Sequence, residues 1–170
     1  MSWHIDPRLA DFVLIAEVER GDRFIDGLFR RKFGSAPPDF GHHLVAFYRR
    51  PDRAFIPAAY LHLWTRDGVG FVGGGCTDGH VVRTMNADER ARIEAAGGLL
   101  LQMLGFCFSK FEPGLEAFFG RCGDARAKEV DLRAGFEETR APLLLIRPNR
   151  PLTAERREEL LRGVEAIGAF

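Results

Sequence analysis

Residues 92–108 read RIEAAGGLLLQMLGFCF, a charged segment followed by two glycines and ten residues of almost unbroken apolar character. From Leu99 onward the segment is apolar on every side. That pattern predicts a helix buried in the middle of a domain. The glycines, Gly97 and Gly98, indicate either a loop of small residues that opens this helix or a helix interrupted by two glycines.

Three strands joined by hairpins are predicted before this segment. In the second strand, Tyr60, His62 and Trp64 occupy alternate positions, so we expect them to share one face of a sheet. The Asp67-Gly68 pair predicts a tight hairpin turn between the second and third strands. The expected strands cover residues 43–49, 55–65 and 69–76.

The third strand carries three consecutive glycines at positions 73–75. Glycine weakens a strand because it adds no side chain to the packing. Three together therefore indicate either a structural bulge or the close approach of another backbone or a ligand.

Caps and apolar spacing predict the remaining elements. Residues 6–20 fit either a helix opened by Asp6-Pro7 or a buried strand around 12–15, and both alternatives stay open. Asp78-Gly79 is typical of a turn. The other expected elements are a helix over 24–33 ended by Gly34, a helical turn opened by Asn86, a strand over 115–121, a helix over 124–134 capped by Asp124 and ended by Gly135, one or two strands over 136–146, and a last helix capped by Thr153.

This order of elements predicts a single α/β domain of the α+β kind over residues 1–170. A meander of antiparallel strands has to join a sheet whose later strands follow helices. We therefore expect a mixed, mostly antiparallel central sheet with helices on both faces.

Composition narrows the classes of function. Lys+Arg and Asp+Glu both total 24, and such a neutral chain has no field to hold a nucleic-acid backbone. The three cysteines show no metal-binding spacing, so we expect buried free thiols and no metal. The N-terminus has no signal pattern and no apolar run is long enough for a membrane span. We expect a cytoplasmic protein without membrane partners, and a homodimer stays open.

Two segments resemble the GNAT acyltransferases, which use acyl-CoA. In that family a loop of the form Q/R-x-x-G-x-G/A opens a helix and binds the pyrophosphate of coenzyme A with its amides. Arg92, Ala95 and Gly97 stand at the first, middle and last of the main positions, so the middle glycine is replaced by alanine. Glu94 adds a negative charge beside them.

The second segment matches N-x-x-A-x-x-L-Y-x-x-x-G-F, a short helix that ends at a strand. Asp124, Ala127, Gly135 and Phe136 have the same spacing. The family's tyrosine, which commonly protonates the departing thiolate, is replaced by Asp131. An aspartate with a pKa near its usual ~4 is ionised at neutral pH and needs burial to stay protonated. Independently of the resemblance, helical spacing predicts that Glu129 and Arg133 pair at i,i+4.

The resemblance implies that acetyl-CoA binds as a co-substrate where the fourth and fifth strands separate. The residues expected to line that site are Gly74, Gly75, Cys76, Arg92, Ala95, Gly97, Gly98 and Asp124. No glutamate lies between Ala54 and Met85, so the candidate catalytic groups are His62, Asp78 and Asp131.

The resemblance implies transfer of an acetyl group to an amine, on a small molecule or a peptide, by direct attack on the thioester. The alternative function is a GNAT-like domain without catalysis that binds CoA, another ligand or a protein. The third alternative is an unrelated α+β domain whose short motifs match by chance.

Overall fold

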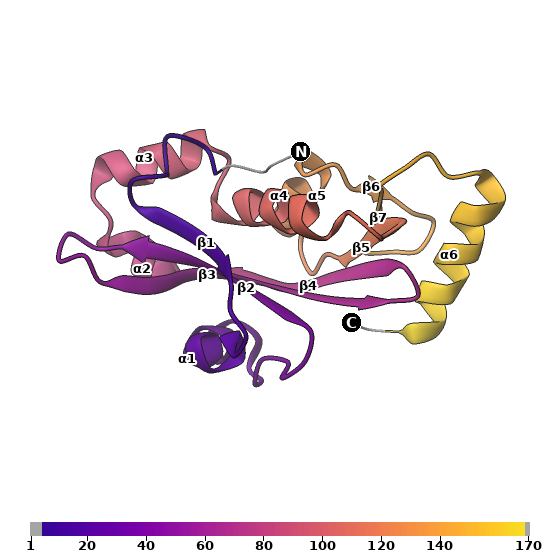
Figure 1. Cartoon of the computed structure of the whole chain (residues 1–170), viewed down its shortest axis with the longest axis horizontal. Helices are drawn as coiled ribbons and strands as arrows, with labels where there is room; N and C mark the ends of the chain where they lie inside the picture. The colour runs from indigo at the N-terminus through magenta and orange to yellow at the C-terminus, as the bar shows by residue number, and fades with distance from the viewer. Residues whose placement is uncertain (1–4, 169–170) are drawn as a thin grey trace.

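The computed structural model describes residues 5–168 and contains one seven-stranded sheet with helices on both faces (Figure 1). The strand order is β1-β2-β3-β4-β5-β7-β6. Among the strands of residues 5–168, only β4 and β5 run parallel, so the expected mixed, mostly antiparallel sheet is confirmed. The predicted absence of a signal peptide involves residues 1–4, and the predicted domain extends to residues 169–170. Both segments lie outside the described residues.

The strands and helices follow one another in the order expected from the sequence, with one additional helix. The strands are β1 (Val13–Glu17), β2 (His42–Arg49), β3 (Phe55–Arg66), β4 (Val69–Thr77), β5 (Ala117–Arg121), β6 (Glu137–Glu138) and β7 (Leu144–Pro148). The helices are α1 (Gly21–Phe33), α2 (Gly79–Thr84), α3 (Ala87–Ala95), α4 (Leu99–Phe111), α5 (Ala125–Arg133) and α6 (Ala154–Ile167).

The N-terminal alternatives resolve in favour of the strand. The Asp6 side chain accepts the N–H of Arg8 at 3.0 Å, which closes a local turn instead of opening a helix. The chain then enters β1, which pairs antiparallel with β2. The apolar run of this segment fits a buried helix and a buried strand equally well, so its pairing with β2 determines that it forms a strand.

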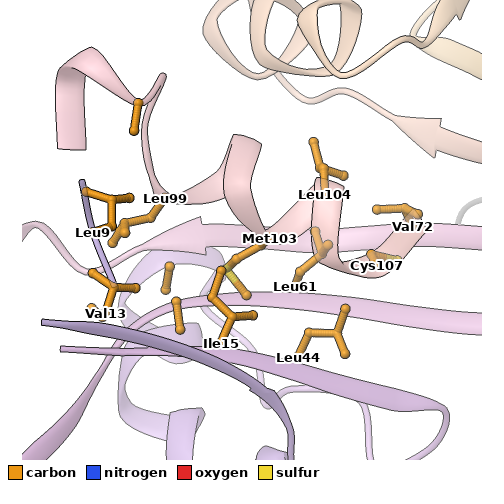
Figure 2. Close-up of a cluster of buried hydrophobic side chains, with 14 of the residues drawn as sticks. Leu9, Val13, Ile15, Leu44, Leu61, Val72, Leu99, Met103, Leu104 and Cys107 are labelled. Atoms are coloured by element: carbon orange, nitrogen blue, oxygen red, sulfur yellow. The ribbon is translucent and has the colours of Figure 1, made fainter. Parts of the chain in front are cut away.

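The larger core lies between the sheet and α4. Figure 2 shows Leu99, Met103 and Cys107 of α4 pointing toward side chains such as Leu61 and Val72 on the strands. We call this side of the sheet the α4 face. The predicted buried helix is confirmed, because one side of α4 packs on the strands while α5 lies along another.

The opposite face of the sheet is covered by α1 and α6, and we call it the α1 face. Tyr60 and Cys76 pack under α1, whereas Phe71 and Trp64 pack with α6. The rings of Trp64 and Phe71 stack 4.2 Å apart. Tyr60, His62 and Trp64 therefore share one face of β3 as predicted, since Leu61 lies in the core of the other face.

The segment after β4 differs from the expectation. Asp78-Gly79, predicted as a turn, instead opens α2, since the Asp78 side chain accepts the N–H groups of His80 and Val81 at the helix N-terminus. The expected helical turn at Asn86 is confirmed as the start of α3.

Within residues 5–168, no single helix combines the length and apolar character needed to cross a membrane. The helices α3 and α4 pass that test only together, and a bend of 50° separates them.

Candidate active site

The strand β5 pairs in parallel with only the first part of β4. Their register runs from Val69 opposite Ala117 to Val72 opposite Gly120, and β4 then continues without β5 beside it. At the same point the register between β3 and β4 shifts, and Gly74 has a φ of +59°. The predicted bulge is therefore present, and it lies where the two strands separate.

A cleft of about 550 Å³ occupies this separation. Its walls come from both faces of the sheet: α1 contributes on one face, and α4 and α5 on the other. The lining includes Lys32, Phe33, Gly73, Gly74, Gly75, Cys76, Gly97, Gly98, Leu99, Leu100, Gly120, Arg121, Asp124, Arg126, Val130 and Asp131.

The segment predicted as a pyrophosphate loop has a different local structure. The helix α3 runs through Ala95, so the alternative of a helix interrupted by two glycines is the one observed. The N–H of Gly97 donates to the Glu94 carbonyl and that of Gly98 to the Ile93 carbonyl, both at 2.9 Å. This is the Schellman end of α3, and it uses both glycine amides.

The N-terminus of α4 faces the cleft without a side-chain cap. Leu99 and Leu100, the first two residues of this helix, line the cleft. The first N–H groups of a helix have no partner within the helix, and the helix dipole adds a partial positive charge there. The amides able to bind an anion are therefore those at the start of α4, and not those of the motif from Arg92 to Gly97.

Arg92 and Ala95, both on α3, lie outside the cleft lining. The Arg92 guanidinium donates to Asp11 at 3.1 Å and lies 4.6 Å from the centre of the Phe12 ring. This contact fastens α3 to the segment before β1. Ala95 is exposed on α3.

His62 and Asp78 are also held in contacts away from the cleft. Nε2 of His62 lies 2.7 Å from the Phe40 carbonyl oxygen, and burial lowers the pKa of this histidine. Asp78 caps α2 and accepts from Arg31 Nη2 at 2.7 Å. Neither side chain lines the cleft.

Asp131 and Asp124 both line the cleft and differ in electrostatics. Asp124 caps α5 by accepting the Ala127 N–H at 2.8 Å, and this hydrogen bond lowers its pKa. The carboxyl of Asp131 has no hydrogen bond or ion pair with residues 5–168. Burial raises its pKa to about 6, so roughly a tenth of it is protonated at pH 7.

Cys76 also lines the cleft. Its thiol is buried, and burial raises its pKa to about 11. Cys107 and Cys122 are buried as well, so the expectation of buried free thiols is confirmed. A thiol that stays protonated at neutral pH is a poor nucleophile.

Besides Arg121, three basic side chains at the cleft were not predicted from the sequence. Lys32 and Arg126 line it, and a Cβ built on Gly97 would lie 2.8 Å from Nη2 of Arg133. None of the three forms an ion pair within the described chain. The predicted pairing of Arg133 with Glu129 is wrong, because Arg133 turns toward the α3–α4 junction. No sequence signal connects these residues, since Lys32 and Arg126 are almost a hundred positions apart.

No model of a known protein family matches the chain, and no curated protein sequence matches it. Among solved structures, the apo form of FdhC, a nucleotide-linked sugar GNAT, is similar with a TM-score of 0.50 and 12% identity. That match covers 90% of this chain and 93% of FdhC. The ribosomal-protein-S18-alanine N-acetyltransferase from Escherichia coli matches with a TM-score of 0.46 and 12% identity. That match covers 84% of this chain and 97% of the acetyltransferase. The chain has the GNAT fold.

Proposed function

We propose that this protein transfers an acyl group, such as acetyl, from acyl-CoA to an amine within the cleft between β4 and β5. The observation that carries the proposal is the separation of these strands after Val72 and Gly120, which leaves the edge of β4 open beside a cavity. An extended amide-bearing arm such as pantetheine fits such an edge, because it can hydrogen-bond to the backbone as a strand does.

The charges around the cleft support binding of the CoA phosphates. The uncapped N-terminus of α4, Arg126 and Arg133 lie on the α4 face of the cleft, and all three favour anions. In this proposal the glycine amides of the α3–α4 junction do not contact phosphate. Gly97 instead permits the close approach of Arg133.

The proposed reaction is a direct displacement. The amine nitrogen attacks the thioester carbonyl carbon, a C–N bond forms, and the C–S bond breaks with its electron pair going to sulfur. The nitrogen loses one proton and the thiolate gains one. Asp131 is the group we assign to proton transfer, because it is the partner-free carboxyl in the cleft lining and has a pKa of about 6.

Calorimetric titration with acetyl-CoA and free CoA tests the binding step. We expect Arg133→Glu to weaken binding at least tenfold, about 1.4 kcal/mol, because it places a negative charge beside the phosphates. Arg162→Glu, an exposed change of the same kind on α6, serves as the control and should leave affinity unchanged. Absence of heat with millimolar acetyl-CoA would refute the proposal. Gly97→Glu is a less specific test, since Gly97 has a φ of +87° and any side chain there is strained.

The pH dependence of kcat/KM, followed by thiol release, tests the role of Asp131. With proton transfer by ionised Asp131 and a neutral amine as nucleophile, log kcat/KM should rise with a slope of about two below pH 6 and of about one above it, up to the pKa of the amine. In Asp131→Asn the slope should be about one through pH 6, from a rate at least tenfold lower at that pH. Identical profiles would exclude Asp131 from the chemistry. CoA binding without thiol release from any amine would favour the non-catalytic alternative.

A further inference from the structure

Two exposed phenylalanine rings lie on the α1 face of the sheet, on either flank of the glycine bulge in β4. A Cβ built on Gly74 would lie 3.0 Å from Cε2 of Phe29 and 3.6 Å from Cβ of His62, so these two side chains border the bulge. The centre of the Phe33 ring lies 4.5 Å from that of Phe29, and the centre of the Phe40 ring lies 5.2 Å from that of His62. Phe33 and Phe40, which are 44% and 55% exposed, are therefore the next side chains outward from the bulge.

The position of Phe40 is fixed although its ring is exposed. Nε2 of His62 donates to the Phe40 carbonyl at 2.7 Å, and the Phe40 ring meets that of Trp64 edge-on with 6.3 Å between their centres. The next residue, Gly41, has a φ of +75°, and a Cβ there would lie 2.6 Å from the Leu63 carbonyl oxygen. This glycine lets the chain run directly against β3. A ring held in this way binds a ligand with little further loss of conformational entropy.

The two rings lie on the side of the bulge that remains for the acceptor. In the proposed function the CoA phosphates bind on the α4 face, beside Arg126 and Arg133. If the thioester lies at the bulge, where β4 leaves β5, an amine that reaches it from the α1 face passes both rings. Phe33 belongs to the cleft lining itself, and Phe40 lies outside it. This inference therefore rests on the proposed function.

The charged side chains around the rings have both signs. The exposed Lys32 precedes Phe33, and the exposed Asp39 precedes Phe40. The charged residues of the cleft lining are Lys32, Arg121, Asp124, Arg126 and Asp131. Apolar aromatic surface is the feature that the two flanks of the bulge share, so it is the feature that distinguishes one acceptor from another here.

We infer that the acceptor is a small primary amine joined by a short chain to an aromatic ring, and that Phe33 and Phe40 bind this ring on the α1 face. Aromatic rings favour edge-on and offset contacts with one another. The amine nitrogen forms the C–N bond, the C–S bond breaks, and the CoA thiolate takes up the equivalent of the proton that the nitrogen loses. Amines without a ring bind more weakly because they leave both phenylalanines in water.

Thiol release from acetyl-CoA with a matched set of amines tests the inference. 2-Phenylethylamine carries the aromatic ring, ethylamine has the same nitrogen and chain without it, and 2-cyclohexylethylamine has a non-aromatic ring of similar size. At equal concentrations of the unprotonated amine, we expect kcat/KM for 2-phenylethylamine to exceed that for ethylamine roughly tenfold or more, with 2-cyclohexylethylamine between them. Ethylamine or 2-cyclohexylethylamine used as well as 2-phenylethylamine would overturn the inference.

The variant Phe40→Ala should raise KM for 2-phenylethylamine about tenfold and leave the Kd for acetyl-CoA unchanged. Phe55→Ala is the matched control, because Phe55 is a comparably exposed phenylalanine at the start of β3 and lies outside the cleft lining. It should leave both constants unchanged. Equal KM values in the two variants would contradict the inference. So would a dimer that Phe40→Ala dissociates, seen by light scattering, because the ring would then belong to a contact between two copies of the chain.

Calorimetry with acetyl-CoA separates this inference from the proposed function. Where acetyl-CoA binds and thiol is released only with ethylamine, spermidine or a peptide amine, the proposed function stands and the aromatic acceptor is excluded. Absence of acetyl-CoA binding defeats both.

Discussion

Gly74 has a left-handed backbone conformation at the bulge, where β4 leaves β5. A Cβ on Gly74 would lie 3.0 Å from Cε2 of Phe29. Gly75 lacks a positive φ, and its Cβ would meet Leu61 and Leu100 at 3.3 and 3.6 Å. The two adjacent glycines therefore have different roles: Gly74 turns the backbone and Gly75 keeps the cleft open.

Alanine substitutions separate these two roles. We expect Gly74→Ala to lower the free energy of unfolding by about 1–2 kcal/mol, because a side chain at positive φ is strained. Gly75→Ala should change stability by less than about 1 kcal/mol but weaken acetyl-CoA binding, since its methyl group projects into the lining. Denaturant unfolding and calorimetry measure the two effects. Equal losses of stability would show that the backbone conformation of Gly74 is not the cause.

Asp131 should make stability depend on pH. Its pKa in the folded protein, about 6, lies above the usual value of 3.8. The ionised carboxylate therefore destabilises the folded state above pH 6, and this destabilisation disappears as the pH falls toward 4. Asp131→Asn should therefore be more stable than the wild type by about 1–2 kcal/mol at pH 7.5, after allowance for solvent screening, and equally stable below pH 4. Thermal unfolding across this range checks the sign, and a stability difference that does not vary with pH would contradict it.

At the scale of elements, α3 is fastened by its first turn. Asn86 and Glu89 form a reciprocal capping box, and the buried Glu89 also accepts a hydrogen bond from the Tyr48 hydroxyl at 3.1 Å. Burial, followed by this hydrogen bond, raises the pKa of Tyr48. Because α3 and α4 meet at Gly97-Gly98, the cap also helps to position the start of α4 at the cleft.

Loss of this cap should be costly. Glu89→Ala removes half of the capping box and leaves the Tyr48 hydroxyl unpaired, so we expect about 2 kcal/mol less stability. Glu94→Ala, at an exposed position of the same helix, should change stability by no more than about 0.5 kcal/mol. Urea denaturation compares the two variants, and similar costs would contradict the role assigned to Glu89.

At the scale of the whole molecule, the cleft joins segments from α1, α4 and α5 that are distant in sequence. A ligand that bridges them should stabilise the folded state by mass action. With acetyl-CoA at a hundred times its Kd, we expect the free energy of unfolding to increase by about 2.7 kcal/mol and Tm to rise by roughly 5–10 °C. Arg133→Glu should reduce the rise, and a Tm independent of acetyl-CoA would argue against binding in the cleft.

The local elements were determined largely by the sequence. Asp67-Gly68 adopts the positive φ values of a tight turn, and Asp124 and Thr153 cap the helices that they were expected to cap. The glycine triplet contains the bulge. Such features depend on hydrogen bonds and steric limits within a few residues, which is why they can be predicted without the rest of the chain.

Only the tertiary structure decided which side chains reach the cleft. It enclosed His62 beneath Phe40, used Asp78 to cap a helix, and kept Arg92 on α3 against Asp11. It brought Lys32 and Arg126 into the cleft lining instead, and Arg133 beside Gly97. These outcomes depend on the packing of segments tens of residues apart, and spacing along the chain carries no information about which distant side chains meet.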